Sequence, residues 1–343
     1  MLAAHPEIRD LMRPAPSTAV WCVLVAGLQV GLALYAANLS WGWVVGLAWL
    51  CGAWLNMAMF ELAHQCNHSL VFKKTSWNRW LFTLVSLPMF LSAHHTWWVE
   101  HLVHHNDLGA KKDFITRRRT LLLMTRRASP MFLPYSLPML VLQLGRSIVG
   151  LVVYMGGLLR GRLEPSWLAL AILGDAHLIS GYRKSRITHW AVVYPLLNIA
   201  LTVALFGLAG WKAVVYLLAS QTFMTGFLHP VMFGIILSTS HFYGHRHYQP
   251  TASYYGWLNK LTFNNGMHTE HHDIAAIPWQ HMPKLRRIAP EFFEPLTTVK
   301  SYVGLALEFV FGGSETMAVK FDHEEYMNRR RFTELAAAGP NSR

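Results

Sequence analysis

Apolar residues along the chain are gathered into long runs that short polar links separate. The first run extends from Val20 to Ala37 with Gln29 as its polar exception, and the second extends from Val44 to Phe60. Both runs are close to the roughly 20 residues with which a helix crosses a hydrocarbon layer of about 30 Å. The short link between them, residues 38–42, holds no charged residue. The pattern therefore predicts a hairpin of two membrane-spanning helices.

A second pair of runs, Trp190–Gly210 and Val214–Thr239, predicts a second hairpin. Two further apolar stretches contain prolines, which break helices: 80–98 is predicted to be a re-entrant or interfacial helix pair, and 130–159 is predicted to be interfacial. The expected fold class is an all-α integral membrane protein with four transmembrane helices in two hairpins, re-entrant or interfacial helices, and a cytosolic helical cap that holds a two-metal site. A single domain is expected over residues 1–343, divided into a cytosolic N-terminal segment (1–17), the first hairpin (18–62), a cytosolic and interfacial region (63–188), the second hairpin (189–240) and a cytosolic tail (241–343).

Composition supports the membrane interpretation, because hydrophobic residues make up 53% of the chain and charged residues only 14%. The net charge of +12 lies mostly in the segments between the apolar runs, and the link inside the first hairpin has no Lys or Arg. Cytosolic loops of membrane proteins are enriched in Lys and Arg. The basic segments and both termini are thus predicted to be cytosolic, and a nucleic-acid partner is not expected.

Eight histidines in three clusters are the candidate functional residues. His64 and His68 are four residues apart, and two copies of a His-x-x-His-His motif follow in the chain. Spacings of three and four place side chains on one face of a helix, so each cluster directs its imidazoles the same way. Each cluster adjoins the cytosolic end of an apolar run. The predicted metal ligands are His64, His68, His101, His104, His105, His268, His271 and His272.

Imidazole ligands alone suit zinc, iron, copper or nickel. The first cluster has no Glu after its first His, which departs from the zinc metalloprotease motif. Soluble di-iron bundles use several Glu-x-x-His pairs, and here only Glu61 and His64 match one. The pattern favours an all-histidine site for two non-haem iron ions, with O2 as co-substrate. At the membrane surface such a site meets alkyl chains from the bilayer and electrons from an external carrier.

Several motifs resemble the membrane fatty-acid desaturase and hydroxylase superfamily, and within it the sphingolipid Δ4-desaturases. The resemblance runs through most of the chain, and its longest stretches begin at His5-Pro-Glu, at His101-Leu-Val-His-His and at Ser253-Tyr-Tyr-Gly. It implies a ninth metal ligand, which is expected to be His241, with His245 and His229 as the alternatives. Asn264 and Asp273 are expected to support the ligands from outside. The first cluster departs from the family, since Gln65 stands where the family has Glu.

The resemblance implies an oxidoreductase that desaturates a sphingoid base, a ceramide or a related long-chain acyl lipid. Its electron donor would be a cytochrome b-type protein, or a ferredoxin with its reductase. A lipid hydroxylase of the same superfamily is the alternative, because both reactions begin with the same hydrogen abstraction. A non-enzymatic membrane metal carrier is a more distant one. The active site is expected on the cytosolic face of the endoplasmic reticulum or of the bacterial inner membrane.

Overall fold

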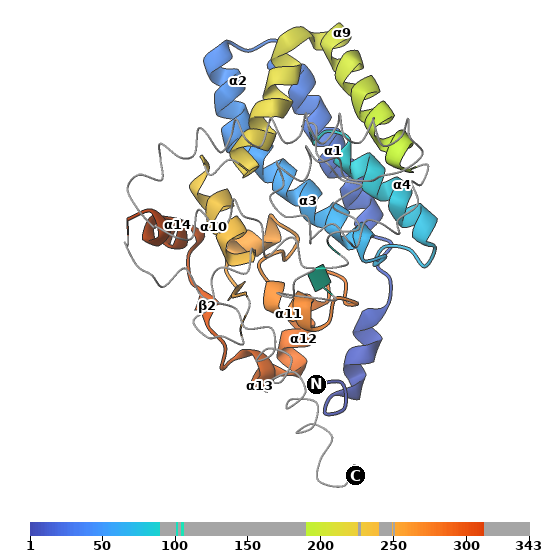
Figure 1. Ribbon diagram of the computed structural model, residues 1–343, viewed down its shortest axis with the longest axis vertical. Coiled ribbons are helices and arrows are strands. Elements are labelled where there is room, and N and C mark those ends of the chain that lie inside the picture. Colours follow the sequence, from blue (N-terminus) through green and yellow to red (C-terminus); the bar gives the residue numbers. More distant parts are fainter. Residues whose placement is uncertain are drawn as a thin grey trace, which may run out of the picture.

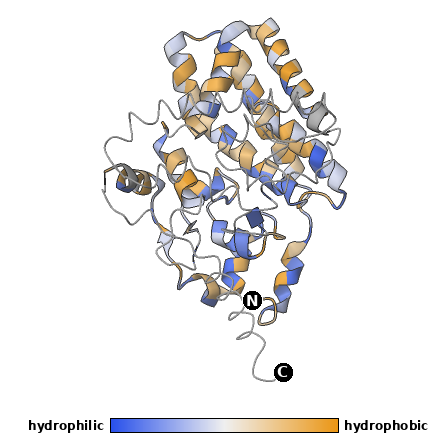
Figure 2. Ribbon diagram, viewed as in Figure 1, coloured by the Kyte–Doolittle hydropathy of each residue, from blue (hydrophilic) through white to orange (hydrophobic). Residues whose placement is uncertain are grey.

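The computed structural model describes residues 1–89, 101, 104–105, 190–225, 228–239, 249 and 251–311. Helices dominate this part of the chain and divide into two regions (Figure 1). The long helices α1, α3 and α9, with the short α2 that continues into α3, make up one region. Short helices α11, α12 and α13 make up the other, beside the N-terminal segment. Hydrophobic residues predominate in the long helices, α11 is hydrophilic, and α12 and α13 are mixed (Figure 2). This division agrees with an integral membrane protein that carries a polar cap.

The first hairpin is confirmed. Helix α1 spans Thr18–Ala36, and a second continuous helical run spans Trp41–Asn67, composed of α2 (Trp41–Leu47), a π-helical turn η2 (Ala48–Gly52) and α3 (Ala53–Asn67). Both runs are long and apolar enough to cross a membrane. Large apolar side chains on α1, such as Val20 and Leu24, are more than half exposed, which suits a helix that faces lipid.

Helix α9 (Trp190–Thr225) contains the third span candidate, Leu196–Met224. At Gly210 the backbone adopts φ 68° and ψ −166°, so α9 consists of two helices that fold back on each other (Figure 1). Next to this turn, the Lys212 ammonium donates hydrogen bonds to the carbonyl oxygens of Ala37 (3.5 Å) and Leu39 (2.5 Å). The turns of the two hairpins therefore lie side by side at one end of the helices.

The predicted continuous fourth span, 214–239, is wrong. Helix α9 ends at Thr225, residues 228 and 229 are not helical, and a separate ten-residue helix α10 follows over Pro230–Thr239. Proline lacks an N–H group and disfavours helical geometry in the residue before it, so a helix can begin at Pro230 but does not run through it. By length and composition, three candidate spans are found in the described part of the chain, so the predicted number of four is not confirmed.

Close helix packing holds this region together. Gly52 faces α9 so tightly that a Cβ atom there would lie 1.9 Å from the Ser220 hydroxyl oxygen. Helix α4 (Thr75–Ser86) packs against α1 and α3 and begins before the predicted 80–98 segment. The rest of that segment beyond residue 89, and all of 130–159, lie outside the described residues.

The tail contains more regular structure than a polar cap of helices alone. Strand β1 (Ser253–Tyr254) pairs in parallel with β2 (Thr298–Val299), which corrects the strictly all-α expectation. A short 3-10 helix η5 (Trp257–Lys260), α11 (His268–Asp273), α12 (Met282–Ile288) and α13 (Pro290–Phe293) lie between the strands. The apolar helix α14 (Tyr302–Phe311) follows and packs against α10.

The N-terminal segment lies against this cap. A 3-10 helix η1 (Pro6–Met12) buries Ile8 and Leu11 in a small apolar cluster with residues of α12 and α13. His5 Nε2 lies 2.5 Å from Glu291 Oε1, and His281 Nδ1 donates to the Leu11 carbonyl oxygen at 2.9 Å. The first residues of the chain therefore close one side of the region that carries the third histidine cluster.

Candidate metal centre

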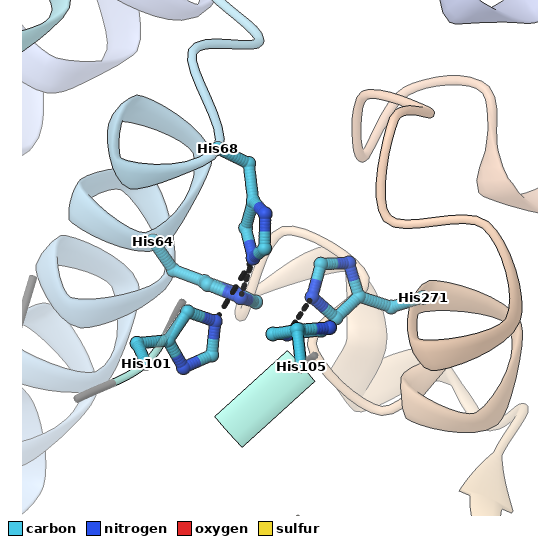
Figure 3. A group of neighbouring side chains, drawn as sticks. All are labelled: His64, His68, His101, His105 and His271. Carbon is cyan, nitrogen blue, oxygen red and sulfur yellow. Dashed lines mark hydrogen bonds between the residues drawn. The ribbon is translucent and has the colours of Figure 1, made fainter. Parts of the chain in front are cut away.

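The first histidine cluster lies at the end of α3. His64 is buried in the last turn of the helix, and His68 caps it. Ser69 follows with φ 58°, a left-handed conformation that ends the helix there. The four-residue spacing places both imidazoles on one face, as predicted. They point toward the imidazoles of His101, His105 and His271 (Figure 3).

The second and third clusters approach from other parts of the chain. His101 and His104 are buried, and His105 is partly buried. The third cluster forms most of α11, on which His268, His271 and His272 are all buried. Residues 263 and 264, which both have positive φ, turn the chain shortly before α11 begins.

Five imidazoles from the three clusters meet at one point. The nearest ligand nitrogens of His64, His68, His101, His105 and His271 all lie within 4.8 Å of one another (Figure 3). His68 Nε2 lies 3.1 Å from His64 Nε2 and 2.9 Å from His101 Nε2. His271 Nε2 lies 3.1 Å from His105 Nε2.

The remaining three histidines continue this group. His272 Nε2 lies 3.2 Å from His268 Nε2, and the His104 and His272 ring centroids are 5.1 Å apart. The His105 ring stacks on His272 with a centroid distance of 4.2 Å. All eight predicted ligands are thus brought into one continuous cluster, although they are spread along the chain from His64 to His272.

The donor set fits metal ions. Two nitrogens bound to one ion at about 2.1 Å and at right angles would be about 3.0 Å apart, close to the Nε2–Nε2 distances here. Metals bind the uncharged imidazole. Burial lowers the pKa of His68, His101 and His105, and of His268 and His271 on α11; neighbouring histidines lower these pKa values further. These five imidazoles are therefore held in the uncharged form that coordinates metal.

A buried carboxylate that the sequence reasoning did not assign supports the cluster. Glu61 Oε2 accepts hydrogen bonds from His64 Nδ1 at 3.0 Å and from Asn265 Nδ2 at 2.8 Å. Glu61 Oε1 accepts from Gln65 Nε2 at 2.8 Å, and Gln65 Oε1 accepts from the Trp279 backbone N–H at 3.0 Å. The Glu61-x-x-His64 spacing was a signal in the sequence that could have indicated Glu61. No pattern in the sequence indicated Asn265 or Trp279.

A second buried acid fixes α11. Glu270 accepts hydrogen bonds from Ser253 Oγ and from the Tyr255 hydroxyl, both at 2.6 Å. The Arg286 guanidinium lies 3.7 Å from the centre of the Tyr255 ring. Burial raises the pKa of Glu270, while the two hydrogen bonds oppose that shift. These contacts tie the helix of the third cluster to β1 and to α12.

The other predicted site residues have varied positions. Asn264 Nδ2 donates to the Trp279 carbonyl oxygen at 2.8 Å, and Asp273 closes α11 with its side chain partly buried. His229 lies at the break before α10, where its ring packs against Trp49 and Trp54 with centroid distances of 4.5 and 5.7 Å. His241 and His245 lie outside the described residues.

Comparison with known proteins gives a family for this arrangement. The family model described as fatty acid desaturase matches residues 17–302, which include all three histidine clusters. The chain is 32% identical to the sphingolipid delta(4)-desaturase/C4-monooxygenase DES2 of Homo sapiens over 92% of this chain and 87% of the relative. It is 30% identical to a sphingolipid delta(4)-desaturase DES1-like protein of Oryza sativa subsp. japonica (88% and 81%), and 28% identical to the sphingolipid delta(4)-desaturase of Candida albicans (92% and 82%).

Proposed function

The chain belongs to the fatty acid desaturase family and is a membrane lipid desaturase. From that premise we propose that its substrate is a sphingoid base, a ceramide or a related long-chain acyl lipid, and that it uses two non-haem iron ions and O2 to oxidise it. The observation that carries the proposal is the meeting of eight histidines from three distant clusters at the end of the spanning helix α3. Eight imidazoles are about right for two ions, and iron is a metal that imidazole suits.

The residues of the chain would hold the irons and keep water away from them. His64, His68, His101, His105 and His271 form one ligand group, and His104, His268 and His272 would complete the second, with His241 as a proposed ninth ligand. Bound iron would supply the oxidising power, drawn from O2, that removes hydrogen from an unactivated methylene. Asn264 and Asp273 remain proposed supports of the ligands from outside.

The position of the cluster suits a lipid substrate. Since α3 carries His64 at the end of a 27-residue apolar helical run, an alkyl chain could reach the cluster from the bilayer. Electrons would come from the aqueous side, from a cytochrome b-type protein or a ferredoxin with its reductase. The charge of the loops supports a multi-pass topology with the cluster on the cytosolic face of the endoplasmic reticulum or bacterial inner membrane.

Hydroxylation is the second candidate activity. The human relative is named both a desaturase and a C4-monooxygenase, so a protein similar to this chain carries both activities in its name. The two products differ in mass, because desaturation removes two hydrogen atoms and hydroxylation adds one oxygen atom. Lipid extracts from cells that express the chain would distinguish them.

The decisive experiment is lipidomics in a host that lacks ceramide desaturation, with the wild type and His271→Ala compared at equal protein levels. We expect an unsaturated long-chain base with the wild type and none with the variant. Metal analysis of the purified protein should find two irons per chain. Product formation by His271→Ala at the wild-type level would refute the site, and iron without any lipid product would favour a metal carrier.

A further inference from the structure

Glu61 occupies the centre of a buried hydrogen-bond network that touches the metal cluster. Its side chain is 3% exposed, and three side-chain donors, from His64, Gln65 and Asn265, satisfy its two oxygens. A buried carboxylate without hydrogen-bond partners would cost free energy, and these three donors offset that cost. The network lies directly behind one of the five converging imidazoles.

The contact with His64 determines which ring nitrogen faces the cluster. A carboxylate accepts hydrogen bonds, so the His64 proton is on Nδ1, where it meets Glu61 Oε2 at 3.0 Å. The lone pair is then on Nε2, which lies 3.1 Å from His68 Nε2 within the cluster. Metal-binding histidines are commonly oriented in this way by a carboxylate on the other ring nitrogen.

The same carboxylate joins two distant parts of the site. Asn265, in the turn just before α11, reaches Glu61 across 204 residues of sequence. Gln65 extends the network to the Trp279 backbone, just after α11. Both ends of the segment that carries the third histidine cluster are therefore attached to the helix that carries the first.

We propose that Glu61 is a positioning residue for the metal centre, which orients His64 through Nδ1 and holds the first and third histidine clusters in register. This role rests on the proposed function, because it assumes that the cluster binds metal. Because the Glu61 oxygens accept hydrogen bonds from His64, Gln65 and Asn265, Glu61 would act through His64 rather than as a ligand.

Glu61→Gln tests the proposal with almost no change in shape. An amide has one acceptor oxygen, and it would face three donors. If that oxygen accepts from His64 and Asn265, the new NH2 group at position 61 faces the NH2 group of Gln65, and two donors oppose each other. Turning the Gln65 amide relieves this conflict but places the Gln65 NH2 group against the Trp279 N–H, again donor against donor. The mismatch therefore persists somewhere in the network. We expect the affinity for Fe2+, measured anaerobically by chelator competition on the full-length protein in detergent, to fall about 10- to 100-fold.

The double variant Glu61→Gln/Gln65→Glu exchanges the two groups and removes the mismatch. The amide now at position 61 would accept from His64 and Asn265 and donate to the carboxylate now at position 65, which would also accept from the Trp279 N–H. We expect this variant to regain about tenfold or more of the lost affinity. Glu294→Gln makes the same chemical change on the exposed surface, and it should bind Fe2+ like the wild type.

A further comparison separates positioning from general stabilisation. In a His64→Ala background, Glu61→Gln should lose less Fe2+ affinity than it does in the wild type, because the contact that orients His64 is already gone and only the contacts with Asn265 and Gln65 remain, whereas independent effects would add in full. Wild-type affinity in Glu61→Gln, an unrepaired double variant, or fully additive losses would each overturn the proposal. Failure of the wild type itself to bind Fe2+ would instead refute the proposed metal centre.

Discussion

Gly234 is the position at which one added methyl group should disturb both the fold and the metal centre. It lies in α10, where α14 crosses it. A Cβ atom at this position would lie 2.2 Å from the Tyr302 carbonyl oxygen and 2.6 Å from the Tyr302 Cα and C atoms. All three are backbone atoms, so no side-chain rotation relieves the overlap, and Gly234→Ala requires α10 and α14 to separate.

The size of the effect follows from these distances. Ordinary contacts begin at 3.4 Å, so the 2.2 Å approach is too short by about 1.2 Å. Overpacking of this kind typically costs about 1–3 kcal/mol. Alanine regains about 0.5–1 kcal/mol over glycine within a helix, which leaves a net loss of up to about 2.5 kcal/mol. With an unfolding entropy of about 2.1 cal/mol/K per residue over 343 residues, each kcal/mol of that loss lowers the melting temperature by about 1.4 °C.

The disturbance should also reach the histidine cluster. Thr251 links the two regions, since its hydroxyl donates to the Ser238 carbonyl oxygen at the end of α10, and its own carbonyl oxygen accepts from the Thr269 hydroxyl on α11 at 3.2 Å. A shift of α10 therefore displaces the helix that carries His268, His271 and His272. We expect weaker iron binding as well as lower stability.

Thermal unfolding in detergent, with Gly31→Ala as the matched control, measures this. A Cβ atom at Gly31 in α1 would have nothing within 4 Å, so the control should keep or raise the melting temperature. If Gly234→Ala were as stable as Gly31→Ala and bound iron equally well, the close packing of α10 on α14 would be refuted.

Three further outcomes are expected from other contacts. Metal-free protein should lose stability as the pH falls below about 6.5. In the unfolded chain histidines take up protons there, whereas in the folded protein the histidines with lowered pKa values do not. Each of these histidines lowers the free energy of unfolding by about 1.4 kcal/mol per pH unit below that point. A melting temperature that does not change between pH 7.5 and 5.5 would contradict this. Tyr255→Phe should lower the free energy of unfolding by about 1–3 kcal/mol, because it leaves a buried oxygen of Glu270 without a donor. The control Tyr35→Phe, on the exposed face of α1, should be neutral. Equal unfolding midpoints for the two variants would argue against the Glu270 network. Lys212→Met should lower the free energy of unfolding by about 1 kcal/mol, because it removes the hydrogen bonds to the Ala37 and Leu39 carbonyl oxygens. The exposed control Lys260→Met should leave it unchanged. Equal stability of the two variants would speak against adjacent hairpin turns.

Much of the architecture could be predicted because it depends on local patterns. The apolar run and the uncharged link defined the first hairpin, and spacings of three and four residues placed the histidines on shared helix faces. The apolar run 214–239 predicted one continuous helix, and that was wrong because Pro230, a local signal that hydropathy does not register, begins a separate helix.

The contacts between distant segments could not be predicted in this way. That Glu61 meets Asn265, that Glu270 meets Ser253 and Tyr255, and that α10 packs on α14 all depend on where separate segments lie after folding. Hydropathy and periodicity determine which face of an element is buried. They do not determine which buried donor will meet which acceptor, because many pairings satisfy the same pattern and only close packing selects one.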